Sequence, residues 1–115
     1  MSVSISNCTA FARGTTPVIT LNVSPPEILD GATIHLCIKQ GQLPPVTKRT
    51  EELNIDLANG VISVKLSQLE TLRFFPGAAC VQIRGVDPAG TAWATDMEPI
   101  DVLPVLEGGV IEYGG

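Results

Sequence analysis

Apolar side chains alternate with polar or small ones in several short stretches, and this period of two limits the fold more than any other feature. The alternation runs through residues 18–23, 33–38, 61–66 and 79–84, with Pro, Gly, Asn or Asp near the ends. Successive side chains of an extended strand point to opposite faces, so each stretch can bury one face. The aliphatic residues are rich in β-branched types, which favour strands. The pattern therefore predicts a β-protein, and 115 residues are enough for one domain.

Asn59-Gly60 predicts a tight hairpin between two of the strands. A type I′ turn needs positive φ at both central residues, and Asn-Gly tolerates this best. A two-residue loop here places three apolar pairs on one face: Leu57 with Ile62, Ile55 with Val64, and Leu53 with Leu66.

A second turn is predicted at Asp87-Pro88-Ala89-Gly90, with Pro suited to the second turn position and Gly to a left-handed residue. A bulged three-residue loop sets Gly85 opposite Trp93, Ile83 opposite Thr95, and Val81 opposite Met97. Trp93 then faces a residue without a side chain and is expected in the core. On the opposite face, Arg84 is expected to pair with Asp96.

Ser67-Gln68-Leu69-Glu70 has the spacing of a capping box and predicts one helical turn at about residues 67–72. With seven or eight short strands, the chain is expected to be all-β: a two-sheet β-sandwich of immunoglobulin-like architecture. A small barrel is the alternative. We expect the sandwich to span residues 1–103 and a C-terminal tail to span residues 104–115.

The net charge is −5, and the seven Lys and Arg residues are scattered along the chain. Such a field repels a phosphate backbone, so nucleic acid is not an expected partner. No apolar run reaches the roughly 18 residues of a membrane helix. The N-terminus lacks the basic and apolar regions of a signal peptide, so synthesis and folding in the cytoplasm are expected.

The sequence suggests no catalytic, cofactor or metal site. The cysteines are Cys8, Cys37 and Cys80, without Cys-x-x-Cys spacing, and reduced thiols are expected. His35 is expected on a sheet face, with no nucleophile or carboxylate assigned to it. We therefore expect a protein that is not an enzyme.

The segment after Val102 is apolar but interrupted by glycines, and it is the candidate interaction tail. Its apolar residues are costly to leave in water, at about 25 cal/mol per Å². They either fold back on their own sheet, pack on a neighbouring subunit, or stay disordered. These residues are Val105, Leu106, Val110, Ile111 and Tyr113.

The order of several segments resembles small proteins encoded in the tail regions of phages and prophages, akin to the N-terminal domain of baseplate upper proteins. The segments are Ile19 to Val23, Leu29-Asp30-Gly31-Ala32-Thr33-Ile34, residues 62–72, Phe75-Pro76-Gly77, residues 81–84 and Gly108-Gly109-Val110-Ile111.

The resemblance implies a structural or assembly module of a virion tail. Its partners would be further copies of itself, in a homo-oligomer, and other tail proteins. It would be made in the bacterial cytoplasm and reside in the virion. A carbohydrate- or cell-surface-binding module is the alternative, although the aromatic residues that could serve as sugar platforms are few. They are Phe11, Phe74, Phe75, Trp93 and Tyr113.

Overall fold

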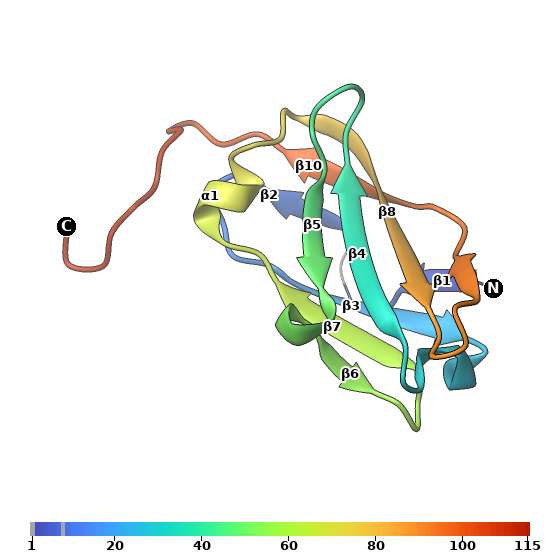
Figure 1. The fold of residues 1–115 in the computed structure, drawn as a ribbon. Helices are drawn as coiled ribbons and strands as arrows, with labels where there is room; N and C mark the ends of the chain where they lie inside the picture. Colours follow the sequence, from blue (N-terminus) through green and yellow to red (C-terminus); the bar gives the residue numbers. More distant parts are fainter. Residues whose placement is uncertain (1, 8) are drawn as a thin grey trace.

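The computed structural model describes residues 2–7 and 9–115 and has two β-sheets packed face to face (Figure 1). The first sheet has the order β1-β3-β7-β6, with bounds Ser2–Ile5, Val18–Ser24, Val61–Lys65 and Asn54–Asp56. The second has the order β2-β10-β8-β4-β5, with bounds Ala10–Ala12, Glu98–Leu103, Gly77–Val86, Thr33–Lys39 and Val46–Arg49. Strand β9 (Ala92–Ala94) pairs with β8 beside this path. The short helices are η1 (Pro26–Leu29), η2 (Thr50–Glu52) and α1 (Gln68–Thr71).

The strand order confirms the predicted immunoglobulin-like sandwich. The order β1-β3-β7-β6 matches the A-B-E-D sheet of such domains, and β10-β8-β4 matches their G-F-C strands. Strand β5 extends this second sheet, and β2 pairs in parallel with β10 at its other edge. The sheets remain separate, so the alternative of a small barrel is wrong.

The predicted alternation sets the core. In β3, β4, β7 and β8 every second side chain is buried between the sheets, and its neighbours face outward. The largest fully buried side chains come from both sheets and from the loops that close the ends: Phe74, Ile19, Leu21, Leu29, Ile34, Leu36, Ile38, Ile62, Leu66, Ile83, Ile100 and Val46.

The bulged turn after β8 is confirmed near its tip. Gly85 lies opposite Trp93, Asp87 N–H donates to the carbonyl of Thr91 at 2.9 Å, and Gly90 has a φ of +87°. Thr95 also lies beside Ile83 as predicted, donating its N–H to the Ile83 carbonyl at 2.9 Å.

Beyond Thr95 the predicted pairing is wrong by one residue, because Val81 lies opposite Glu98 rather than Met97. The hydroxyl of Thr95 accepts the Ile83 N–H at 3.1 Å. At the point where the register shifts, this side chain therefore takes the place of a backbone carbonyl as the acceptor. Asp96 does not pair with Arg84. Its carboxylate instead accepts the N–H of Val3 at 3.0 Å.

The predicted two-residue hairpin at Asn59-Gly60 is also wrong, because β6 and β7 pair Ile55 with Ile62 and leave residues 57–60 as a four-residue turn. Asn59 donates from its backbone and side chain to the Asp56 carboxylate, at 3.4 and 2.8 Å. Gly60 has a φ of +67°, and every residue with positive φ in the described part of the chain is a glycine. Asn59 therefore does not adopt the type I′ conformation. The slip is two residues, so Ile55 keeps its predicted face, whereas Leu57 falls in the turn and is exposed instead of buried.

The predicted helical turn is confirmed at α1. The Ser67 hydroxyl accepts the Glu70 N–H at 3.1 Å, and the Glu70 carboxylate accepts the Ser67 N–H at 2.8 Å. These reciprocal bonds are the capping box. Within residues 2–7 and 9–115, no helix has the length and apolarity needed to cross a membrane.

Candidate functional site

The C-terminal tail leaves the sandwich at the end of β10 and extends away from both sheets (Figure 1). Val105 is half-buried, but the other four predicted contact residues are exposed. Leu106 and Tyr113 are as open as in an extended peptide, at 110% and 107% relative exposure, while Val110 and Ile111 are at 50% and 67%. The tail does not fold back over its own sheet, which was one of the three predicted possibilities.

Gln68, the first residue of α1, holds the tail at one point. Its Nε2 donates to the carbonyl of Ile111 at 2.9 Å, and its Oε1 accepts the Ile111 N–H at 2.8 Å. A primary amide carries a donor and an acceptor side by side, so it pairs with a peptide group as a neighbouring strand would. The path of the tail past α1 is therefore defined by a side chain.

Gln40 makes the same arrangement where β4 ends beside the start of β8. Its Nε2 donates to the Phe75 carbonyl at 2.7 Å, and its Oε1 accepts the Phe75 N–H at 2.8 Å. Arg13 adds two bonds nearby, from Nε to the carbonyl of Phe74 at 2.6 Å and from Nη2 to that of Leu72 at 3.1 Å. These contacts fix the segment between α1 and β8, next to the start of the tail.

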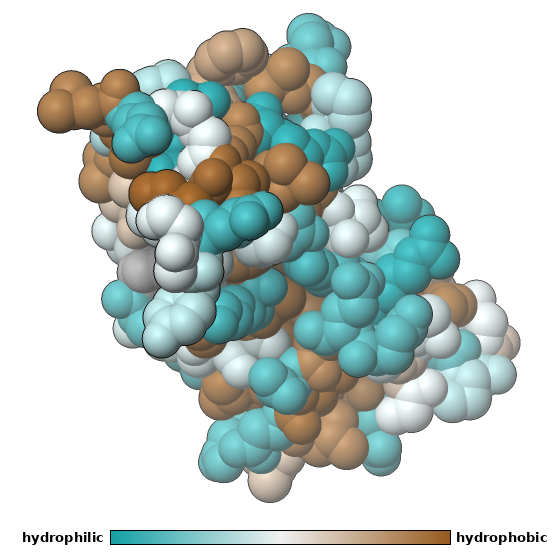
Figure 2. All heavy atoms as spheres, turned by 90° about the vertical axis from the view of Figure 1, so that its left-hand side faces the viewer, coloured by the Kyte–Doolittle hydropathy of each residue, from teal (hydrophilic) through white to brown (hydrophobic). Residues whose placement is uncertain are grey.

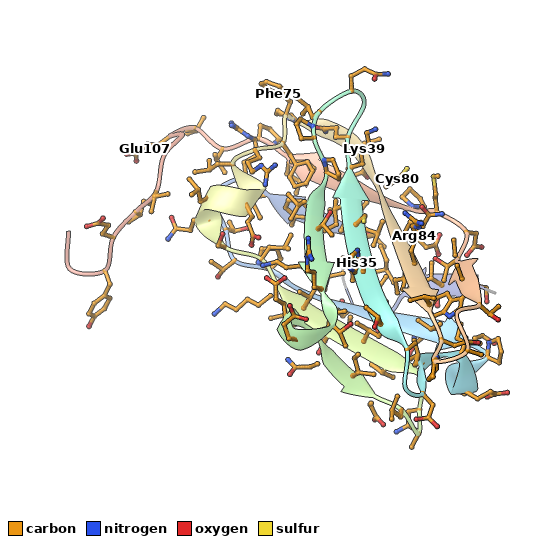
Figure 3. The ribbon with its side chains drawn as sticks, viewed as in Figure 1. His35, Lys39, Phe75, Cys80, Arg84 and Glu107 are labelled. Atoms are coloured by element: carbon orange, nitrogen blue, oxygen red, sulfur yellow. The ribbon has the colours of Figure 1, made fainter. Side chains whose placement is uncertain are left out.

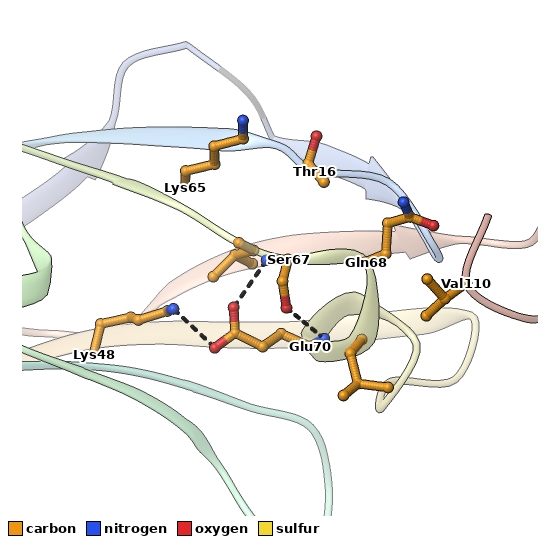
Figure 4. A pocket seen from close by; sticks show the side chains of 9 residues that line it. Thr16, Lys48, Lys65, Ser67, Gln68, Glu70 and Val110 are labelled. Atoms are coloured by element: carbon orange, nitrogen blue, oxygen red, sulfur yellow. Dashed lines mark hydrogen bonds and ion pairs between the residues drawn. The ribbon is translucent and has the colours of Figure 1, made fainter. Parts of the chain in front are cut away.

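A groove of about 570 Å³ lies between α1, the ends of β5 and β7, and the tail (Figure 4). Leu66 lies at its base, Leu69 and Val110 contribute apolar walls, and Lys65 stands at its side. In Figure 2 hydrophobic residues of this end of the molecule are open to solvent among hydrophilic ones. The groove and the tail together form a mixed apolar and charged surface.

An ion pair closes one side of the groove. Lys48 Nζ lies 2.8 Å from Glu70 Oε2, and the Lys48 side chain is only 13% exposed. Partial burial opposes the charged form of Glu70, but the hydrogen bonds from Lys48 and Ser67 and the charge of Lys48 outweigh it, so the pKa of Glu70 is lowered. Glu70 thus holds α1 against β5 as a carboxylate.

The other polar residues considered in the sequence do not converge on this groove. His35 lies on the outer face of β4, between Arg49 of β5 and Arg84 of β8. Cys37 and Cys80 are free thiols on that same face, and Cys8 lies outside the described residues. In the described part of the chain no group of three or more His, Cys, Asp or Glu residues is arranged to hold a metal ion.

Sequence reasoning placed the tail but missed the residues that hold it. The amides of Gln68 and Gln40 reach 43 and 35 residues along the chain, and no local pattern marks such contacts. No family model and no curated protein matches this sequence.

Proposed function

We propose that this chain is a non-catalytic structural module of a bacteriophage or prophage tail, of the baseplate type, which acts through protein–protein contacts made by its C-terminal tail. One observation carries the proposal: Leu106, Ile111 and Tyr113 are exposed on a segment whose path is nonetheless held by Gln68. Apolar surface costs about 25 cal/mol per Å² to keep in water, so a partner that buries it gains affinity.

The held path matters because ordering a flexible segment on binding is itself costly. A tail that is already extended and fixed at Ile111 loses less conformational freedom when it meets a partner. Trp93 supports the assembly role over the sugar-binding alternative. It is half-buried against Gly85 and packs on the core, so it is a poor platform for stacking a sugar.

The attribution to a virion tail comes from the resemblance in segment order. It predicts that the genes on either side encode tail proteins. Neighbouring genes of unrelated metabolic function would remove this part of the proposal and leave the contact role to be judged alone.

The contact role is tested by the oligomeric state of the full chain. We expect the full chain to form an oligomer in size-exclusion chromatography with light scattering. A chain ending at Leu103 and the triple substitution L106A/I111A/Y113A are both expected to be monomeric. Circular dichroism shows whether each variant keeps the sandwich. A monomeric full chain at high micromolar concentration would overturn the proposal.

A further inference from the structure

Over β4, β5 and β8 the outer face of the second sheet carries basic residues, although the chain as a whole carries −5 and Asp101 is exposed on the neighbouring β10. His35 lies directly between Arg49 and Arg84 in the strand register, and Lys39 lies further along β4 (Figure 3). We name this surface of β4, β5 and β8 the cationic face, after the charges of Lys39, Arg49 and Arg84. Lys39, Arg49 and Arg84 are exposed, and both salt bridges found among the described residues belong to Lys48 instead.

The same face has an apolar hollow. Cys37, Cys80 and Met97 line a cavity of about 400 Å³ beside Lys39, and Met97 is 63% exposed. Clefts of about 300–1,000 Å³ are the usual size for a bound small molecule, so this hollow has room for a few apolar side chains. A ligand for this face therefore combines carboxylates with apolar side chains.

The C-terminal tail has this composition. Residues 104–115 contain Glu107 and Glu112 and no basic residue, together with the exposed Leu106, Ile111 and Tyr113. Five residues of extended chain separate the two carboxylates by about 17 Å, and Lys39 and Arg84 lie about 13 Å apart on the sheet by strand rise. The side chains of Lys, Arg and Glu are long enough to span the difference between these two separations.

A chain does not place its own tail on this face. Gln68 holds Ile111 beside α1, and Figures 1 and 3 show the tail and Glu107 extending away from the face that carries His35, Lys39 and Arg84. The segment is thus available to a neighbouring molecule.

We propose that the tail of one copy docks on the cationic face of a second copy, with Glu107 and Glu112 against Lys39 and Arg84 and its apolar side chains toward Met97. The proposal rests on the proposed contact role of the tail and specifies its partner. The tail and the cationic face are different surfaces, so the contact is heterologous. Each copy can therefore bind one copy through its tail and another through its cationic face, which builds a ring or a filament.

Charge reversal tests the pairing in the full chain. The tail variant E107K/E112K and the face variant K39E/R84E are each expected to raise the dissociation constant of self-association by about tenfold or more, because like charges then meet. A mixture of the two variants is expected to restore association, since each variant supplies the complement of the other. Sedimentation velocity measures all three samples.

The matched control is R73E, which changes the net charge as much as either single face variant, K39E or R84E, at an exposed position outside both the cationic face and the groove. It is expected to retain native self-association. Equal weakening by R73E and by K39E or R84E alone, or a mixture that stays monomeric, would overturn the docking proposal while tail-dependent oligomers still support the proposed function. A native full chain that never self-associates overturns both.

Discussion

Trp93 lies against Gly85, in the space that a side chain at residue 85 would occupy. A Cβ on Gly85 would be 2.7 Å from Cε2 of the indole and closer still to Cζ2. The two residues are directly opposite in the β8–β9 pair. The backbone of Gly85 has no positive φ, so packing, rather than a special conformation, requires glycine here.

G85A is therefore expected to lower the free energy of unfolding by about 1–3 kcal/mol through overpacking. Urea unfolding measures the change, and G108A, where an added Cβ meets nothing within 4 Å, is the control. The cost should shrink in a W93A background, because the indole is then absent. An undiminished cost in that background would place the strain elsewhere.

Gly60 combines two constraints that can be separated. Its φ is +67°, and an added Cβ would lie 2.6 Å from the Val23 carbonyl oxygen, whereas Gly41 has a φ of +53° with open space around it. G41A is expected to cost about 1 kcal/mol from backbone conformation alone. G60A should cost at least about 1 kcal/mol more in the same urea experiment. Equal costs would show that the contact with Val23 relaxes freely.

Q68A is expected to release the tail without unfolding the sandwich. Two solvent-exposed hydrogen bonds to Ile111 are lost, at about 0.5–1.5 kcal/mol each. The hydrogen-exchange rate of the Ile111 amide should rise by about tenfold, while the urea midpoint stays nearly constant. Q68E removes only the donor and should have an intermediate effect. Unchanged exchange at Ile111 in Q68A would show that the tail is held by other contacts.

The lowered pKa of Glu70 predicts a pH-dependent contribution to stability. A carboxyl group whose pKa is lower in the folded state stabilises the fold above its unfolded-state pKa, 4.5 for Glu70, and this contribution is lost as the pH falls through the folded value. E70Q keeps an acceptor for the Ser67 N–H, because glutamine also serves in a capping box, but it removes the charge that pairs with Lys48, and we expect it to destabilise the chain by about 1 kcal/mol at pH 7.

The difference between the native chain and E70Q should shrink below pH 4 in urea titrations at several pH values. E51Q removes the same charge at an exposed side chain outside the groove, the tail and the cationic face, and its effect on the free energy of unfolding should be small in comparison. A constant difference from pH 7 to pH 3 would contradict the assigned role of the Glu70 carboxylate.

The sequence predicts which side chains face the core far better than it predicts which strand residues are opposite one another. Ile34, Leu36 and Ile38 are buried as their alternation requires. A slip of two residues keeps every side chain on its face, so alternation could not distinguish the predicted β6–β7 register from the observed one. The observed turn contains hydrogen bonds from Asn59 to the Asp56 carboxylate, and the alternation of apolar residues does not encode them.

The tail illustrates the same limit for the candidate site. Its apolar residues mark it as a contact segment from composition alone. Its path depends on Gln68, and the surface we assign to it depends on residues that only the strand register places together, such as Arg49, His35 and Arg84. Pairings between residues distant in the chain are set by tertiary structure and leave no local pattern.

Strand β10 gives the tail a firm mechanical base. It lies between β8, with which it pairs antiparallel, and β2, with which it pairs in parallel. A pull on the tail along the strand loads the hydrogen bonds of both neighbours in shear, so that many must break together rather than one after another. Tension applied to the C-terminal tail would thus be transmitted to β8, the central strand of the second sheet.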